Sequence, residues 1–310
     1  MEKAELSKME SKLLMAIADI PGITPGAFSL RKNGKPVYVN TTPNINIIKK
    51  EDKPGIDIYI RADTKDEEVH IPVVITESGI SDTVYNDFYV GKNADVVINA
   101  GCGIHNDGCT DTHHNGIHRF FLDEGAKVKY VEKHYGEGSG DGKRVLDPVT
   151  EVTLGKNATL EMYTTQIKGV DSTVRNTEAK LDDNSTLLVS EKIMTHGVQH
   201  AETNFSVNLD GKGSSCQVTS RSVATESSTQ KFVSEIYGNN ECFCHVECDA
   251  IIKENGKVVS TPAIVANCLD ANLIHEAAIG KIAGAQITKL MTLGLTEKEA
   301  EDAIINGFLQ

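Results

Sequence analysis

The stretch Asn157-Ala158-Thr159-Leu160-Glu161-Met162 decides the fold, because its pattern recurs along the chain. Each copy has a pair of small, turn-forming residues followed by apolar residues in alternate positions. The other copies begin at Asn93, Gly125, Asn184 and Gly213, so the steps are 32, 32, 27 and 29 residues. Period-two alternation indicates strands, and a repeat of about 20–50 residues indicates a solenoid or a related array. Irregular steps and a repeat made of strands alone favour a β-helix, in which each turn covers the apolar face of its neighbour.

Both ends of the chain have a helical pattern instead. Apolar residues at Leu6, Met9, Leu13, Leu14 and Ile17 follow helical spacing. Near the C-terminus a first helical stripe comprises Ile274, Ala278, Ile282, Ala285, Leu290 and Leu293. Thr296 and Glu299 then form a capping box before a second stripe. The sequence therefore predicts a mainly β protein with an N-terminal helical segment (1–45), a β-helix core (46–268) and a C-terminal helical region (269–310).

Composition excludes several classes of protein. Of the 310 residues 39% are apolar, which supplies a core, and no run is apolar enough for a membrane span. The formal charge of −13 argues against a general nucleic-acid-binding face. The stretch Met1-Glu2-Lys3-Ala4-Glu5 carries no targeting signal, and seven cysteines cannot all pair within one chain. We therefore expect a cytoplasmic protein with reduced thiols.

Cys216 interrupts the repeat in an informative way. It takes the position that Val96, Val128, Leu160 and Leu187 hold in the other copies. By period-two logic its side chain points inward. Two interpretations stay open: a small buried apolar residue, as most free cysteines are, or a thiol that faces a cavity within the stack.

Three clusters of potential ligands stand out. The first comprises Cys102, His105, Cys109, His113, His114 and His118. Thiolate and imidazole suit zinc or iron, but the spacing fits no zinc finger, and a surface loop with scattered histidines is the competing interpretation.

The second cluster is a strand on which Cys242, Cys244 and Cys248 share one face with Val246. Thiolates are the preferred ligands of iron–sulfur clusters, although the spacing is not that of a ferredoxin. An ordinary cysteine-rich strand is the alternative.

The third cluster comprises Cys268, Asp270, His275 and Glu276, and it lacks the second histidine of a zinc-protease helix. The sequence also has no phosphate-binding loop of the Gly-x-x-x-x-Gly-Lys-Ser/Thr type, so the chain is not expected to hydrolyse ATP by itself.

Several strings in the expected order resemble the SufB/SufD family of iron–sulfur cluster assembly proteins over roughly residues 90–310. They are 166–173, 220–223, 245–252, Pro262, 273–282, 294–297 and 304–309. The resemblance implies a right-handed parallel β-helix and a non-catalytic scaffold of the SUF system. It further implies a homodimer through the β-helix, a SufC-like ABC ATPase partner, a sulfur donor and apo iron–sulfur proteins as recipients.

The resemblance also suggests site residues for an iron–sulfur cluster, expected to be 4Fe–4S. His275 and Glu276 match the family's His-Glu pair, and Cys248 matches a cysteine ahead of it. Cys216 is a further candidate for cluster binding or sulfur transfer. Because the segment 256–261 lacks the cysteine that longer relatives carry there, Cys244 and Cys268 are additional candidate ligands.

For the ATPase, the resemblance points to the C-terminal helices, and the residues expected to dock it are Leu290, Ile304 and Phe308. Two other functions compete with the scaffold. A polysaccharide-acting β-helix enzyme is disfavoured by the absence of Trp and of a secretion signal. A zinc-binding structural β-solenoid is the main alternative.

Overall fold

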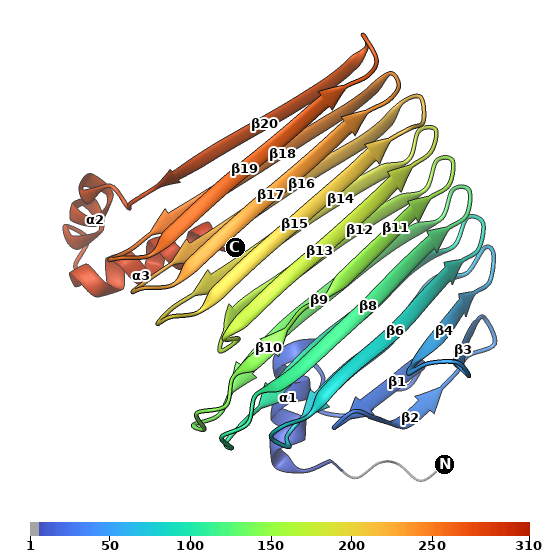
Figure 1. The fold of residues 1–310 in the computed structure, drawn as a ribbon, viewed down its shortest axis with the longest axis horizontal. Coiled ribbons are helices and arrows are strands. Elements are labelled where there is room, and N and C mark those ends of the chain that lie inside the picture. Colours follow the sequence, from blue (N-terminus) through green and yellow to red (C-terminus); the bar gives the residue numbers. More distant parts are fainter. Residues whose placement is uncertain (1–5) are drawn as a thin grey trace.

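Strands alternate between two facing sheets and build a β-solenoid of about eight turns (Figure 1). This computed structural model describes residues 6–310, and the stretch 1–5, expected to carry no targeting signal, lies outside the described residues. Successive strands of the solenoid are stacked in parallel, and among residues 6–310 only the first hairpins, β1–β2 and β3–β4, pair antiparallel. The predicted β-helix is confirmed.

The first sheet has the order β2-β1-β5-β7-β9-β12-β14-β16-β18-β20. Its strands are β1 (Ala27–Lys32), β2 (Lys35–Asn40), β5 (Lys65–Ile75), β7 (Asp95–His105), β9 (Lys127–Glu137), β12 (Thr159–Lys168), β14 (Thr186–Thr195), β16 (Ser214–Ala224), β18 (Cys242–Ile252) and β20 (Ala271–Gly280).

The second sheet has the order β19-β17-β15-β13-β10-β8-β6-β4-β3, with β11 also between β13 and β8. Its strands are β3 (Ile45–Lys49), β4 (Gly55–Ile60), β6 (Ser81–Val90), β8 (Thr112–Leu122), β10 (Arg144–Leu146), β11 (Val149–Leu154), β13 (Ser172–Leu181), β15 (His200–Leu209), β17 (Thr229–Gly238) and β19 (Lys257–Ala266).

The repeat read from the sequence is the ladder of the first sheet. The equivalent residues Val96, Val128, Leu160, Leu187 and Cys216 pair in register from strand to strand and are all buried. The first residue of every copy has a positive φ, from 54° at Asn184 to 72° at Gly213. Asn and Gly tolerate this left-handed conformation, so the turn residues fix where each strand begins. Cys216 points inward as predicted.

The helix α1 (Lys8–Ala18) lies on the outer face of the first sheet, near β5, β7 and β9 (Figure 1). Leu13, Leu14 and Ile17 are buried in this contact, as the helical spacing predicted. The helix approaches closely because β7 has glycines there: a Cβ on Gly101 would lie 2.8 Å from the Ile17 carbonyl oxygen.

At the other end, α2 (Gly284–Met291) and α3 (Glu297–Phe308) follow the last strand. The predicted capping box of Thr296 and Glu299 begins α3. The prediction of a helix from Ile274 was wrong, because Ile274 and Ala278 lie in β20. This strand pairs with the free edge of β18 along its whole length, and a neighbouring strand edge overrides local helical spacing. Strands likewise occupy parts of 1–45, where only a helix was expected.

The last turn of the solenoid, formed by β19 and β20, is uncovered. Most of its residues are exposed, and within residues 6–310 no further strand pairs with the outer edge of either strand. No helix in this described part of the chain is long and apolar enough to span a bilayer.

Candidate functional site

Thiols concentrate on the inner face of the solenoid. Cys102, Cys216, Cys242, Cys244 and Cys248 are buried, Cys268 is half-buried between β19 and β20, and Cys109 is exposed. Cys216 and Cys244 are register neighbours on β16 and β18. Hydrogen bonding with Cys244, together with burial, raises the pKa of Cys216 well above the ordinary thiol value. The Cys216 thiol is therefore protonated at neutral pH, and an incoming cation is needed to make it a thiolate.

Cys248 faces the same interior one turn before the end. It lines a cavity of about 10 Å³ with Glu191 and Ser220 among its neighbours. Burial raises the pKa of Cys248 to about 11, although the nearby Ser260 hydroxyl lowers it.

The strand register places the predicted ligands on two different faces. Val246 pairs with His275, Glu247 with Glu276, and Cys248 with Ala277. Because side chains alternate along a strand, His275 shares the inner face with Cys248, whereas Glu276 lies on the outer face. Within a single chain, Cys248 and Glu276 are not brought together.

His275 is the residue of this region whose side chain most clearly lacks a partner. Both ring nitrogens are shielded from solvent, and neither has a hydrogen-bond partner. Burial, followed by the nearby His245, lowers the pKa of His275, so the ring is neutral and has a free lone pair. An orphaned imidazole on the open last turn fits a metal ligand whose partner group is supplied on assembly.

The outer face beside it carries acidic groups. His245 Nε2 lies 3.6 Å from Glu276 Oε2. A hydrogen bond with Asp249, followed by burial, raises the pKa of Glu247. Glu276 is therefore part of a carboxylate–imidazole group that faces away from the inner thiols.

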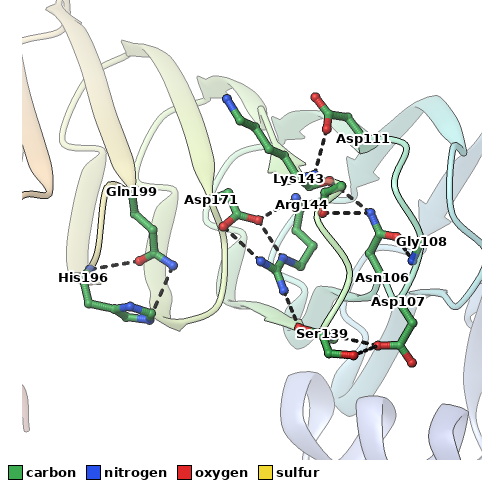
Figure 2. A network of polar contacts seen from close by, with 12 residues as sticks. Asn106, Asp107, Gly108, Asp111, Ser139, Lys143, Arg144, Asp171, His196 and Gln199 are labelled. Carbon is green, nitrogen blue, oxygen red and sulfur yellow. Dashed lines mark hydrogen bonds and ion pairs between the residues drawn. The ribbon is translucent and has the colours of Figure 1, made fainter.

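The first cysteine–histidine cluster is divided by the strand geometry. Cys102, His114 and His118 point inward and are buried, whereas His105 and His113 are partly exposed. Cys109 is exposed, and Figure 2 shows that Asn106, Asp107 and Asp111, on either side of it in the sequence, join their loop to the next one through Ser139 and Lys143. Asn106 Nδ2 donates to the carbonyl oxygens of Thr110 (2.9 Å) and Gly142 (3.1 Å), and Asp107 accepts from Ser139. The surface-loop interpretation therefore holds only for the middle of the cluster.

A column of buried polar side chains inside the solenoid was missed by sequence reasoning. Arg175 donates a hydrogen bond to Glu132, and its Nε lies 3.6 Å from Glu191 Oε2. Burial raises the pKa of Glu132, but Arg175 and His134 lower it more and hold it well below its usual range. Burial raises the pKa of Glu191 despite Arg175, Ser220 and Thr203. Extending the inward positions from Val128 through Tyr130 to Glu132 would have revealed this column.

The residues expected to dock the ATPase differ in how exposed they are. α2 buries none of its residues, Leu290 is partly exposed, and Leu293 just beyond it is 75% exposed. Ile304 on α3 is also partly exposed. Phe308 instead packs within the chain, with its ring centre 5.9 Å from the Arg221 guanidinium.

Within residues 6–310, no three His, Cys, Asp or Glu side chains converge as a ready-made metal site. A bound metal or cluster therefore requires ligands from outside the chain or movement of side chains within it.

Comparison with known proteins gives a consistent result. The family model described as "SUF system FeS cluster assembly, SufBD core domain" matches residues 90–308. An iron–sulfur cluster assembly SufBD family protein of Pyrococcus horikoshii is 28% identical over 284 residues, covering 89% of this chain and 84% of that protein. One of Methanocaldococcus jannaschii is 26% identical, covering 78% and 76%. One of Methanothermobacter thermautotrophicus is 26% identical over 76% of this chain, which spans only 57% of that relative's length.

Proposed function

Because the chain belongs to the SufBD family of the SUF system for iron–sulfur cluster assembly, we propose that it is a scaffold that builds clusters and transfers them. The family supports a role in cluster assembly. In this proposal a sulfur donor supplies sulfur, apo iron–sulfur proteins receive the cluster in the cytoplasm, and a SufC-like ABC ATPase hydrolyses ATP. The scaffold itself performs no catalytic step. The alternative of a zinc-binding structural protein has no support from the comparisons.

The observation that carries the proposal is His275, with two orphaned nitrogens on the open last turn. A second copy that stacks on β19 and β20 would cover this turn and satisfy its unpaired edges. A homodimer through the β-helix would then enclose His275 with inner thiols such as Cys248 and with ligands from the other copy. The cluster, proposed to be 4Fe–4S, is cargo that is held by few permanent ligands, which suits transfer.

Anaerobic reconstitution with Fe²⁺ and sulfide tests the cluster ligands on the full chain. We expect His275→Ala and Cys248→Ser to bind iron at least about tenfold more weakly than the wild type, as loss of a metal ligand does. The measurements are visible absorbance and the iron and sulfide content per chain. His200→Ala is the matched control, since His200 is a partly exposed histidine on β15. Wild-type cluster content in both site variants would contradict the assignment.

The exposed face of α2 is where we propose that the ATPase docks, together with Ile304. Leu290→Asp should abolish co-purification of a SufC-like ATPase, because a buried charge in an apolar contact is costly. Pull-down from cells that express both proteins measures this. The control Ile48→Asp changes a 45% exposed residue on β3, at the other end of the second sheet from β19, and should leave the complex intact. Retention of the ATPase by Leu290→Asp would refute docking at α2.

A further inference from the structure

Two buried imidazoles on β8 face one empty point. His114 and His118 both point inward, and Gly116 lies between them on the same face of the strand. A Cβ on Gly116 would lie 3.1 Å from His118 Nε2 and 3.7 Å from His114 Nε2. Because glycine has no side chain, this point stays open. The cavity beside it measures about 20 Å³, and Cys102, Glu132 and His134 also line it. It is large enough for one water molecule or one ion.

The partner of each ring at Nδ1 keeps the proton on that nitrogen. The lone pair of Nε2 is then free and faces this cavity. His118 Nδ1 lies 2.7 Å from the Tyr130 hydroxyl oxygen, and that hydroxyl donates to Glu132 at 2.9 Å. The Tyr130 oxygen therefore accepts the Nδ1 proton of His118, which leaves Nε2 unprotonated. An outer partner that fixes the histidine tautomer in this way is typical of metal-binding histidines.

The second imidazole is oriented by a carboxylate. His114 Nδ1 lies 3.3 Å from Asp82 Oδ2, close enough for attraction although outside hydrogen-bond geometry. Arg31 holds Asp82 through two contacts, at 2.7 Å from Nε and 2.6 Å from one terminal nitrogen. The negative carboxylate favours the proton on Nδ1, and thus a free lone pair on Nε2 of His114 as well.

The small cavity lies next to a larger one, the mouth cavity, at the N-terminal end of the solenoid. A cavity of about 960 Å³ opens between β1–β2 and β3–β4, and Ile71 and Val73 line both this mouth and the small inner cavity. Asn86 stands between the two cavities: it lines the mouth, and its Nδ2 lies 3.3 Å from His118 Nε2. An arriving ion must displace this amide from His118 Nε2.

We propose that His114 and His118 bind one divalent first-row transition-metal ion at the Gly116 gap, with the mouth cavity as its route. Imidazole suits Fe²⁺, Co²⁺ and Zn²⁺, and Asp82 and Glu132 supply compensating negative charge nearby. The ion would lie in the small cavity beyond this gap, because the gap itself, where a Cβ would sit, is only one C–C bond, about 1.5 Å, from the Gly116 Cα. Both rings must turn toward the ion to reach the usual bond of about 2.1 Å. His114 and His118 supply two ligands, and water or Cys102 completes the coordination. The site lies far along the stack from β18 and β20 and does not depend on the proposed cluster site.

Anaerobic titration with Co²⁺, followed by its visible absorbance, tests the site. The background is the full chain with its two accessible thiols removed, Cys109→Ser and Cys268→Ser, so that surface sulfur does not compete. We expect one Co²⁺ per chain, and binding at least about tenfold weaker in Gly116→Ala, which fills the gap without removing a ligand. His118→Gln should weaken it similarly, whereas Asn86→Ala should strengthen it.

His105→Gln is the matched control, because His105 belongs to the same sequence cluster but contacts Asp107 in the loop. It should bind Co²⁺ as the parent does. Bound Co²⁺ should also raise the melting temperature of the parent and not that of Gly116→Ala. Circular dichroism shows whether each variant is folded. Equal Co²⁺ affinity in the parent, Gly116→Ala and His118→Gln would overturn the proposal, as would no Co²⁺ binding by the parent.

Discussion

Replacing Arg175 by Met is expected to lower the free energy of unfolding by about 3–5 kcal/mol at pH 7, because it breaks a buried ion pair from one side. Arg175 is 5% exposed and lies between Glu132 and Glu191, which are themselves buried. Methionine fills much of the same volume but leaves two carboxylates without their cation. Urea unfolding followed by circular dichroism measures the loss. The control Arg119→Met removes a partly exposed arginine whose buried partner Asp87 keeps Lys50 at 2.8 Å, and it should cost about 1 kcal/mol or less.

The pH dependence of this variant gives a sharper test. In the wild type the pKa of Glu132 is lowered on folding, so its contribution to stability is present above the unfolded pKa and is lost as pH falls through the folded one. Without Arg175, burial, which is the largest influence on Glu132, is opposed chiefly by His134 and His118, so the pKa of Glu132 rises and protonation relieves the variant. The difference in stability between the two proteins should therefore shrink as pH falls from 7 toward about 4.5. A constant difference over this range would show that the ion pair is not its cause.

Replacing Phe120 by Ala is expected to cost about 3–5 kcal/mol, the usual loss for a large buried aromatic side chain. Phe120 is wholly buried and stacks on Phe88 with ring centres 4.6 Å apart and planes within 5°. It also contacts Tyr130 edge-on at 5.0 Å. Removal leaves a cavity that the parallel strands on both sides, held by their ladders, are unable to collapse into.

The neighbouring residue offers a matched control. Phe121 is the next residue on β8, so its ring lies on the outer face, where it stacks on Tyr89 at 5.2 Å. Phe121→Ala should cost roughly 1 kcal/mol, as partly exposed positions usually do. Denaturant midpoints of the two variants, measured side by side, decide the matter: similar losses would mean that Phe120 is not a core residue.

The ladder of the β-helix could be predicted because short local patterns in the sequence encode it. Asn157, Asn184 and Gly213 mark turns by their tolerance of positive φ, and Leu160, Leu187 and Cys216 mark the inner face by alternation. By contrast, Ile274 and Ala278 fit helical spacing and strand alternation equally well. The unpaired edge of β18 decides in favour of a strand, and that edge is a property of the folded stack rather than of the local sequence.

The candidate site was predictable only residue by residue. The sequence identified Cys248, His275 and Glu276, but their division between inner and outer faces follows from the register of β18 and β20. The pair His114 and His118 could have been separated from His105 and His113 only by knowing which strand residues face inward. The contacts of Arg175 with Glu132 and Glu191 join residues 43 and 16 positions away on other turns. No local pattern encodes such contacts.

The two ends of the solenoid differ as building blocks. The N-terminal edges are antiparallel strands that carry Pro36 and Lys35 on β2 and Lys49 on β3. Proline and lysine on an edge discourage further pairing, whereas β19 and β20 end in bare parallel edges. In the terms of polymer chemistry, the chain is a monomer with one reactive end. If two such monomers joined through that end, as proposed above, they would consume it, and growth would stop at a pair instead of continuing into a fibre.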